Sequence, residues 1–379
     1  MTRLAIAVAL LATACGDNYV RIDATVVGVA RYEDRPPLES GALGEISAKP
    51  ARGISVAVIS EDDGSTLATA VTDDGGRYSL EFVGVSGDAI HVLAVASSTL
   101  ASRPISVHGS DGMLHGFGGA TIAAASVTET DLLITIESGE AQAFNAFDVL
   151  LDVMDRIPIA FGVTNPDPLG VFWERGSDDG TYFDGDSIHL LGAADDDDGF
   201  DDTVIIHESG HYVEDHIGRS SSPGGGHDGS PTNPTLAWSE GFATYFSMAV
   251  RDSPIYMDSN ADGGWSYDGD VSITKANGAG AIGQLVSEDM VTEILWDMGD
   301  SPTPDDDPVA ADHDAVLALQ IYLKSAALRP VGKSGVDLVD SLDGWFNTYG
   351  LETCDAMRTI VTTTHTFPYD FMAAGGACP

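Results

Sequence analysis

The feature that most constrains the fold is a change in hydrophobic period near residue 139. Over residues 19–138, short runs such as VRIDATVVGVARY and RYSLEFV alternate apolar with polar residues, and Asp/Gly turns separate them. A period of two is typical of strands with one buried face. The next segment, AQAFNAFDVLLDVMDRI, instead has four large apolar residues at helical spacing: Phe144, Phe147, Leu151 and Met154. We therefore predict a multidomain chain, with an all-β sandwich over 19–138 and an α+β, mostly helical domain over 139–379.

Three further expectations concern elements of the second domain. Pro158 is expected to break the helical pattern, because proline lacks the backbone donor that a helix needs. Ser187–Ala193 (SIHLLGA) predicts a strand, and we place it at a sheet edge where an extended peptide could pair with it. Three later runs predict helices of a C-terminal lobe: VTEILWDMGD, HDAVLALQIYLKSAAL and LVDSLDGWFNTYG.

The first domain contains one specific motif, Thr72–Leu80 (TDDGGRYSL). An Asp/Gly turn leads into a strand that would bury Tyr78 and Leu80 on one face. The motif resembles the T-D-x-x-G-x-Y-x-L signature of carboxypeptidase-regulatory-like, transthyretin-like domains, over about Arg21–Ser98. The resemblance implies an accessory β-sandwich without catalytic residues.

The first residues, MTRLAIAVALLATACGD, indicate export. Arg3 precedes an apolar run that is too short to span a bilayer, and small residues lead to Cys15. The segment 1–15 resembles a bacterial lipoprotein signal, which implies a lipid on Cys15 and anchoring to a membrane or cell surface. Ordinary signal cleavage, giving a secreted soluble or periplasmic protein, is the alternative. The other two cysteines, Cys354 and Cys378, are expected to form a disulfide rather than remain free thiols.

The charge balance excludes several partners. The chain has 17 Lys and Arg against 59 Asp and Glu, a net charge of −42. Nucleic acid and anionic lipid headgroups require clustered cations, so we expect no nucleic-acid partner and no membrane contact except through lipid on Cys15. Solvation in a saline habitat is the simplest reason for so acidic a surface.

The chemistry is concentrated in Val204–Val213 (VIIHESGHYV), which contains H-E-x-x-H. On a helix, His207 and His211 share one face, so their imidazoles can bind one Zn²⁺. Glu208 lies beside them as a general base, and Asp201 and Asp202 suit the helix N-terminus, as a cap and by their charge against the helix dipole. The alternative is a core helix with two hydrogen-bonded histidines.

A third ligand is expected in the segment LAWSEGFATYF, which predicts a second helix after Pro234. Its Glu240 lies among small and aromatic residues, where a carboxylate needs a partner such as a metal. Together, H-E-x-G-H and W-x-E-G-x-A-x-Y-F resemble the gluzincin metallopeptidases. The resemblance implies a zincin-like domain that cleaves peptides or proteins, with Zn²⁺ on His207, His211 and Glu240 and with Glu208 as the base. Thr244 departs from that family, several members of which have Asp at this position to orient a ligand histidine.

Two features leave alternatives open. Gluzincins usually have a further electrophilic His or Tyr, for which His227, His313 and Tyr245 are candidates. Asp258, Asn260 and Asp262 match the opening D-x-N-x-D-G of a calcium loop, although the Glu expected at its twelfth position is missing. Ca²⁺ is therefore a second candidate cofactor.

Two other functions compete with peptide hydrolysis. One is a non-catalytic surface adhesion or binding protein that has a structural metal site. The presence of Glu208 argues against it, because a structural site needs no base and usually closes its fourth position. The other is a zinc hydrolase whose substrate is not a peptide.

Overall fold

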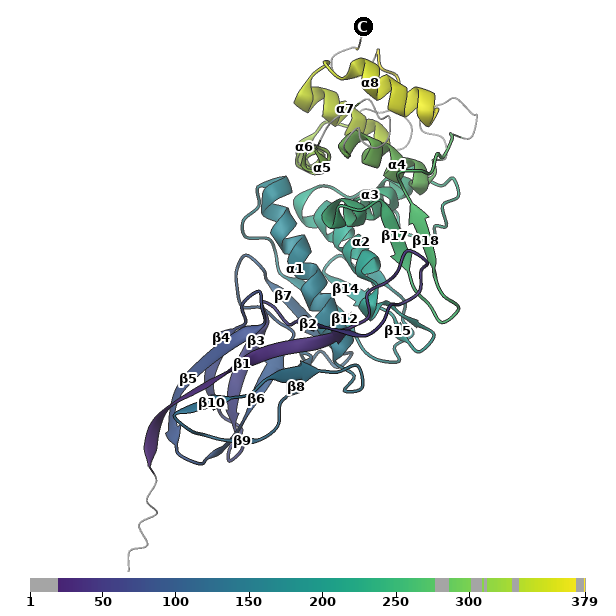
Figure 1. The fold of residues 1–379 in the computed structure, drawn as a ribbon. Helices are drawn as coiled ribbons and strands as arrows, with labels where there is room; N and C mark the ends of the chain where they lie inside the picture. The colour runs from purple at the N-terminus through teal and green to yellow at the C-terminus, as the bar shows by residue number, and fades with distance from the viewer. Residues whose placement is uncertain are drawn as a thin grey trace, which may run out of the picture.

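The computed structural model describes residues 20–276, 286–300, 309, 312–328, 334–372 and 378. The predicted signal segment 1–15, including Cys15, lies outside the described residues. Figure 1 shows an elongated molecule with sheets at one end and the C-terminal helices at the other. Within the described part of the chain, no helix is both long and apolar enough to cross a membrane.

The N-terminal region contains two five-stranded sheets. In the first, the long strand β1 (Arg21–Asp34) pairs with β2 (Ser47–Pro50), β5 (Arg77–Val85), β10 (Val127–Glu129) and β11 (Leu132–Ile134). In the second, the order β4-β3-β6-β8 joins Thr66–Val71, Ser55–Ser60, Ala89–Val95 and Gly116–Gly118, and β9 (Ile122–Ala123) pairs with β6. Alternating side chains of β1, β3, β5 and β6 are buried, as the period of two predicts.

The Thr72–Leu80 turn forms as predicted. The Asp73 carboxylate accepts hydrogen bonds from the backbone N–H groups of Gly75 and Arg77, at 2.9 and 2.8 Å. Gly76 has a φ of +72°, a conformation that favours glycine. Tyr78 and Leu80 of β5 are both buried.

A third sheet holds the start of the second region and one strand of the first. Its order is β13-β14-β12-β7, made of Tyr182–Phe183, Ser187–Leu190, Leu169–Trp173 and Ile105–His108. The edge position predicted for Ser187–Ala193 is wrong, because β14 lies between β12 and β13, and β13 forms the edge. Strand order depends on contacts between distant segments, which the local pattern does not contain.

Helix α1 (Ala141–Phe161) buries the four large apolar residues that define its predicted stripe. The break predicted at Pro158 is wrong, because the helix continues through it to Phe161. Ile157, Ala160 and Phe161 are buried, so tertiary packing keeps the last turn helical. Gly162, with a φ of +69°, then ends the helix.

The remaining elements surround α2 (Asp202–Tyr212) and α3 (Pro234–Arg251). Two small hairpins are β15–β16 (Gly192–Ala193, Asp196–Asp197) and β17–β18 (Ile255–Asp258, Trp265–Asp268). The short 3₁₀ turn η1 (Asp198–Phe200) precedes α2, and the π-helical turn η2 (Val213–Ile217) extends it. The C-terminal lobe contains α4 (Glu288–Gly299), α5 (His313–Leu317), α6 (Leu319–Ser325), α7 (Leu338–Tyr349), α8 (Cys354–Arg358) and η3 (Thr359–Thr364). The predicted Cys354–Cys378 disulfide is present.

A buried polar network joins the first sheet to the start of α2. The Tyr32 hydroxyl of β1 lies 2.9 Å from the Asp148 carboxylate and 3.3 Å from the side-chain oxygen of Asn145, both on α1. The Asn145 amide in turn donates to the carbonyl of Gly199 and to the Asp202 carboxylate, each at 3.1 Å. The β-rich region is thus connected through α1 to the helix that presents the histidine pair.

Candidate metal centre

Helix α2 presents His207 and His211 on one face, with ring centroids 5.0 Å apart. The helix can approach α3 closely because Gly210 lacks a side chain: a Cβ there would lie 2.7 Å from Cα of Ala243. Asp201 precedes the helix as predicted, but its carboxylate does not cap it. It accepts instead from the backbone N–H and the hydroxyl of Ser259, both at 2.9 Å, because Ser259 lies beside it after strand β17.

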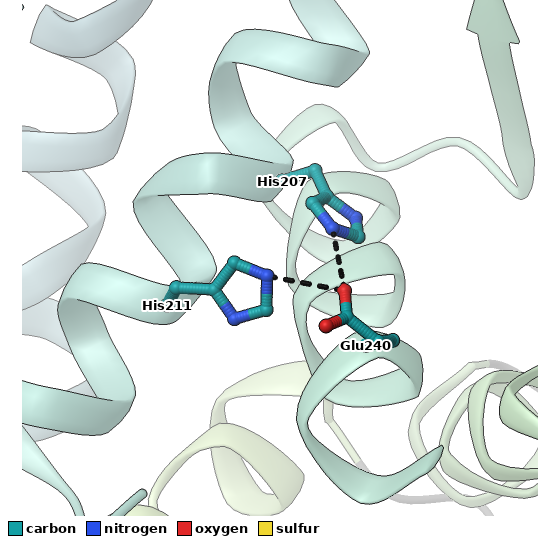
Figure 2. Close-up of side chains that lie close together, drawn as sticks. All are labelled: His207, His211 and Glu240. Carbon is teal, nitrogen blue, oxygen red and sulfur yellow. Dashed lines mark ion pairs between the residues drawn. The ribbon is translucent and has the colours of Figure 1, made fainter. Parts of the chain in front are cut away.

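Helix α3 brings Glu240 to this histidine pair (Figure 2). Its Oε2 lies 3.4 Å from Nε2 of His207 and 3.2 Å from Nε2 of His211. One ligand atom from each residue lies within 4.8 Å of the other two. Burial disfavours the charged form of Glu240, but hydrogen bonds from the two histidines outweigh burial and hold its pKa well below the ordinary value. The sequence prediction thus named three residues that the fold places together.

The other ring nitrogens of both histidines are also engaged. His207 Nδ1 lies 3.1 Å from the Thr244 hydroxyl, at the position where several gluzincins have Asp. His211 Nδ1 lies 3.3 Å from the Ser239 hydroxyl, which donates to the Glu214 carboxylate at 2.5 Å. Such contacts fix ring orientation and tautomer in metal sites.

Sequence reasoning missed both Glu214 and Ser239. Glu214 is fully buried, and its Oε2 lies 3.5 Å from Nδ1 of His211. Its position three residues after His211, on the same helical face, was the available signal. Burial opposes the protonated form of His211, but Glu214 and Glu240 outweigh burial and raise the pKa of His211 well above its ordinary value. A metal ion bound at Nε2 of His211 would take the place of the proton on that nitrogen.

His227 reaches the site from the loop between η2 and α3. Its Nε2 lies 3.4 Å from Glu240 Oε2, and its Nδ1 lies 3.0 Å from Glu288 Oε2 at the start of α4. The Glu288 pairing, together with Glu240, raises the pKa of His227 despite its burial. The other Glu288 oxygen accepts from the Gly229 N–H at 2.8 Å, so one carboxylate holds both the histidine and its loop. Sequence reasoning missed Glu288, because an acidic residue in a first helical turn is ordinary.

His313 is placed elsewhere. It is buried, with Nδ1 3.2 Å from the Tyr245 hydroxyl and its ring against Trp296. Burial lowers the pKa of His313 to about 4, so the ring is neutral in the core. Neither His313 nor Tyr245 is among the described residues that line the two cavities beside the histidine pair. Their positions indicate core packing rather than the electrophilic role considered for them.

Two cavities flank the site and share Thr181, Glu208 and His227 in their walls. The first, of about 430 Å³, lies on the His211 side and is bordered by residues 181–185, which include the edge strand β13. The second, of about 580 Å³, lies on the His207 side. Glu208 therefore faces space on both sides of the proposed ligands.

The predicted calcium loop is the turn of the β17–β18 hairpin. The Asn260 side-chain oxygen accepts from the backbone N–H groups of Asp262 and Gly264, both at 3.0 Å. Asp258 groups instead with Asp196 and Asp198, with one carboxylate oxygen of each within 4.8 Å of the others. The structure thus gives Asp258 and Asn260 surroundings that the loop motif did not predict.

Among the comparisons of this chain with known proteins, one identifies a protein family. A search of curated proteins finds no match. The structure search finds a 9R-lipoxygenase from Cyanothece PCC8801 at 13% identity and a TM-score of 0.18. That match covers 36% of this chain and 24% of the lipoxygenase, and the likeness is too low to bear on the fold. The family profile described as "Mycolysin C-terminal domain" matches residues 162–362, which include α2, α3 and the histidine pair. Since this match covers more than half of the sequence, the chain belongs to the mycolysin C-terminal domain family, which is related to secreted metallopeptidases.

Proposed function

We propose that this chain is an exported zinc metallopeptidase. The observation that carries the proposal is the convergence of His207, His211 and Glu240, with Glu208 on the adjacent helical position. Two imidazole nitrogens and one carboxylate oxygen form the donor set of hydrolytic zinc sites that keep a fourth position open. The low pKa of Glu240 and the engaged Nδ1 atoms fit that role, because metal ligands must be deprotonated and oriented.

A bound zinc ion would supply Lewis acidity for water and for the substrate carbonyl. Glu208 would accept the proton of the attacking water and deliver it to the leaving amine. His227 would donate to the oxygen that becomes negative, held for that task by Glu288. The family profile supports the reading, because it covers both helices of the site.

We also propose where the substrate lies. Strand β13 (Tyr182–Phe183) is at the edge of its sheet, and residues 181–185 border the 430 Å³ cavity beside Glu208 and His211. An extended peptide that adds to this edge would place its backbone across the site. We therefore assign the pairing with substrate to β13 rather than to β14, the strand for which the sequence had suggested it.

The proposal extends to the rest of the chain as follows. The N-terminal region would be an accessory module of the carboxypeptidase-regulatory-like type, and a lipid on Cys15 would anchor the enzyme outside the cytoplasm. The 139–379 region would be its zincin-like, gluzincin-type domain. Ca²⁺ stays a second candidate cofactor.

The test compares the parent protein, Glu208→Gln and the surface control Glu352→Gln. Metal content and cleavage of casein and of a peptide library are measured on all three. We expect one zinc per chain in each, and a loss of cleavage of about 10²–10⁴-fold in Glu208→Gln alone. Zinc without cleavage by the parent would favour a binding protein or a non-peptide substrate. Absence of zinc after reconstitution would refute the ligand assignment.

A further inference from the structure

The cavity on the His207 side has an unusual wall for a site that binds uncharged peptide. Along with Glu208 it is lined by five other carboxylates: Asp198, Asp228, Asp258, Glu288 and Asp289. Of the described residues that line it, none is Lys or Arg. Glu288 is paired with His227, whereas Asp258 is on strand β17 and Asp198 lies beside it.

Two of these carboxylates, Asp198 and Asp258, lie close together. Asp198 is only 5% exposed, and one of its oxygens lies within 4.8 Å of an oxygen of Asp258 and of Asp196. Asp196 Oδ1 is buried and has no hydrogen-bond partner among the described residues. Burial and the neighbouring acids raise the pKa of Asp198 to about 7 and also raise the pKa of Asp258. A cation in the cavity would relieve both the burial cost and the mutual repulsion.

Aromatic rings form the other part of the same wall. Tyr256 and Trp265 face each other across the hairpin with ring centroids 5.5 Å apart, and Trp265 is 50% exposed. Tyr267 of the same hairpin also lines the cavity. Aromatic faces attract organic cations, and guanidinium groups in particular stack on them while their N–H groups bind carboxylates. A calcium ion would gain nothing from these rings, since it takes oxygen ligands.

The cavity lies directly beside the proposed zinc site. It begins at His207 and Glu208, so its occupant would be part of whatever is held at the proposed zinc site. A volume of about 580 Å³ accommodates a long side chain together with water. Resting on the proposed peptidase function, we propose that this cavity is a specificity subsite for a basic side chain, Arg or Lys, next to the cleaved bond. Asp258 and Asp198 would bind the charged group of this side chain. The rings of Tyr256 and Trp265 would contact its aliphatic stem and, for Arg, the planar face of the guanidinium group.

The test uses matched peptides that differ only in charge. Fluorogenic peptides carry either Arg or its neutral isostere citrulline on each side of the cleaved bond. For the parent, kcat/KM should favour Arg by about tenfold on one side, as expected for a charge-assisted contact. Asp258→Asn should lower kcat/KM for the Arg peptide and so bring the ratio close to one. Glu352→Gln, the exposed surface control, should behave as the parent.

A binding measurement separates this inference from the proposed activity. Calorimetry with N-acetyl arginine amide and N-acetyl citrulline amide on zinc-loaded Glu208→Gln should show binding of the arginine probe only, and adding Asp258→Asn should abolish it. Cleavage of both peptides at equal rates by the parent would overturn the subsite while leaving the peptidase intact. Calcium binding that depends on Asp258, with no preference for Arg, would assign the carboxylates to a metal and also overturn it. Failure to cleave any peptide would contradict the proposed function itself, whereas the amide binding would still report on the cavity.

Discussion

The buried charge of His365 should make this protein less stable in alkaline solution. His365 is 1% exposed, and its Nε2 lies 2.8 Å from the Asp297 carboxylate. Its Nδ1 lies 3.4 Å from Glu293 Oε2, one turn earlier on α4. Burial disfavours the imidazolium, but the two carboxylates outweigh burial and raise the pKa of His365 to about 9.

The size of the effect follows from that pKa. An ordinary histidine pKa of 6.5 lies about 2.5 units lower, and each unit corresponds to about 1.4 kcal/mol, so His365 contributes about 3 kcal/mol. Because folding raises the pKa, this stabilisation is fully present below about pH 6.5 and is lost as the pH rises through about 9. Replacing His365 with Gln removes the charge and leaves two buried carboxylates without their cation.

The assay is urea denaturation of the parent and of His365→Gln at several pH values between about 6 and 10. The parent should be more stable by about 3 kcal/mol at the acidic end, and the difference should shrink toward the alkaline end. Asp201, whose pKa burial raises to about 8, titrates in the same window, but its contribution cancels between the two proteins. His91→Gln, on the second sheet, is the control. A difference that stays constant across the range would refute the reasoning.

Three further predictions concern the site and its support. Thr244→Val should weaken zinc binding by about tenfold, because His207 loses the hydroxyl that orients its ring. The affinity is measured by competition with a chelating dye, and an unchanged affinity would contradict the orienting role of Thr244. Gly210→Ala should lower the free energy of unfolding by about 1–3 kcal/mol and also weaken zinc binding, because its Cβ would meet the backbone of Ala243 at 2.7 Å. A thermal scan and a metal analysis measure the two effects, and parent-like values in both would contradict the prediction. Cys354→Ser should lower the free energy of unfolding by about 3 kcal/mol through loss of the bond to Cys378, and equal denaturation midpoints for variant and parent would disprove it.

Local geometry explains which parts of the site the sequence could predict. His207 and His211 are four residues apart, so any helix there puts them on one face. Glu240 was identified by its small and aromatic neighbours and by its motif, and α3 begins at Pro234 close to the predicted start. Strands β1, β3, β5 and β6, the α1 stripe and the disulfide likewise follow from the local apolar pattern or from the number of cysteines.

The remaining contacts depend on segments far apart in the chain. Glu288 holds His227 across 61 residues, and nothing in either segment indicates the other. The Asp258 partners come from β16 and η1, which precede α2, so the calcium motif alone could not identify them. In the sheet β13-β14-β12-β7, strand β7 packs against α1 while β13 and β14 pack against α2, and no local pattern shows these contacts, which is why an interior strand was taken for an edge.

The placement of β7 limits how this chain can be divided or recombined. Ile105–His108 lies in the N-terminal region but pairs in parallel with Leu169–Trp173, beyond α1. Cutting the gene near residue 139 would remove this strand and leave β12 with an open, unpaired edge, which invites aggregation. The two regions should therefore melt in one calorimetric transition, and attaching residues 139–379 to a foreign module would not reproduce the native third sheet. Evolution can exchange such a module only together with the sheet that it completes.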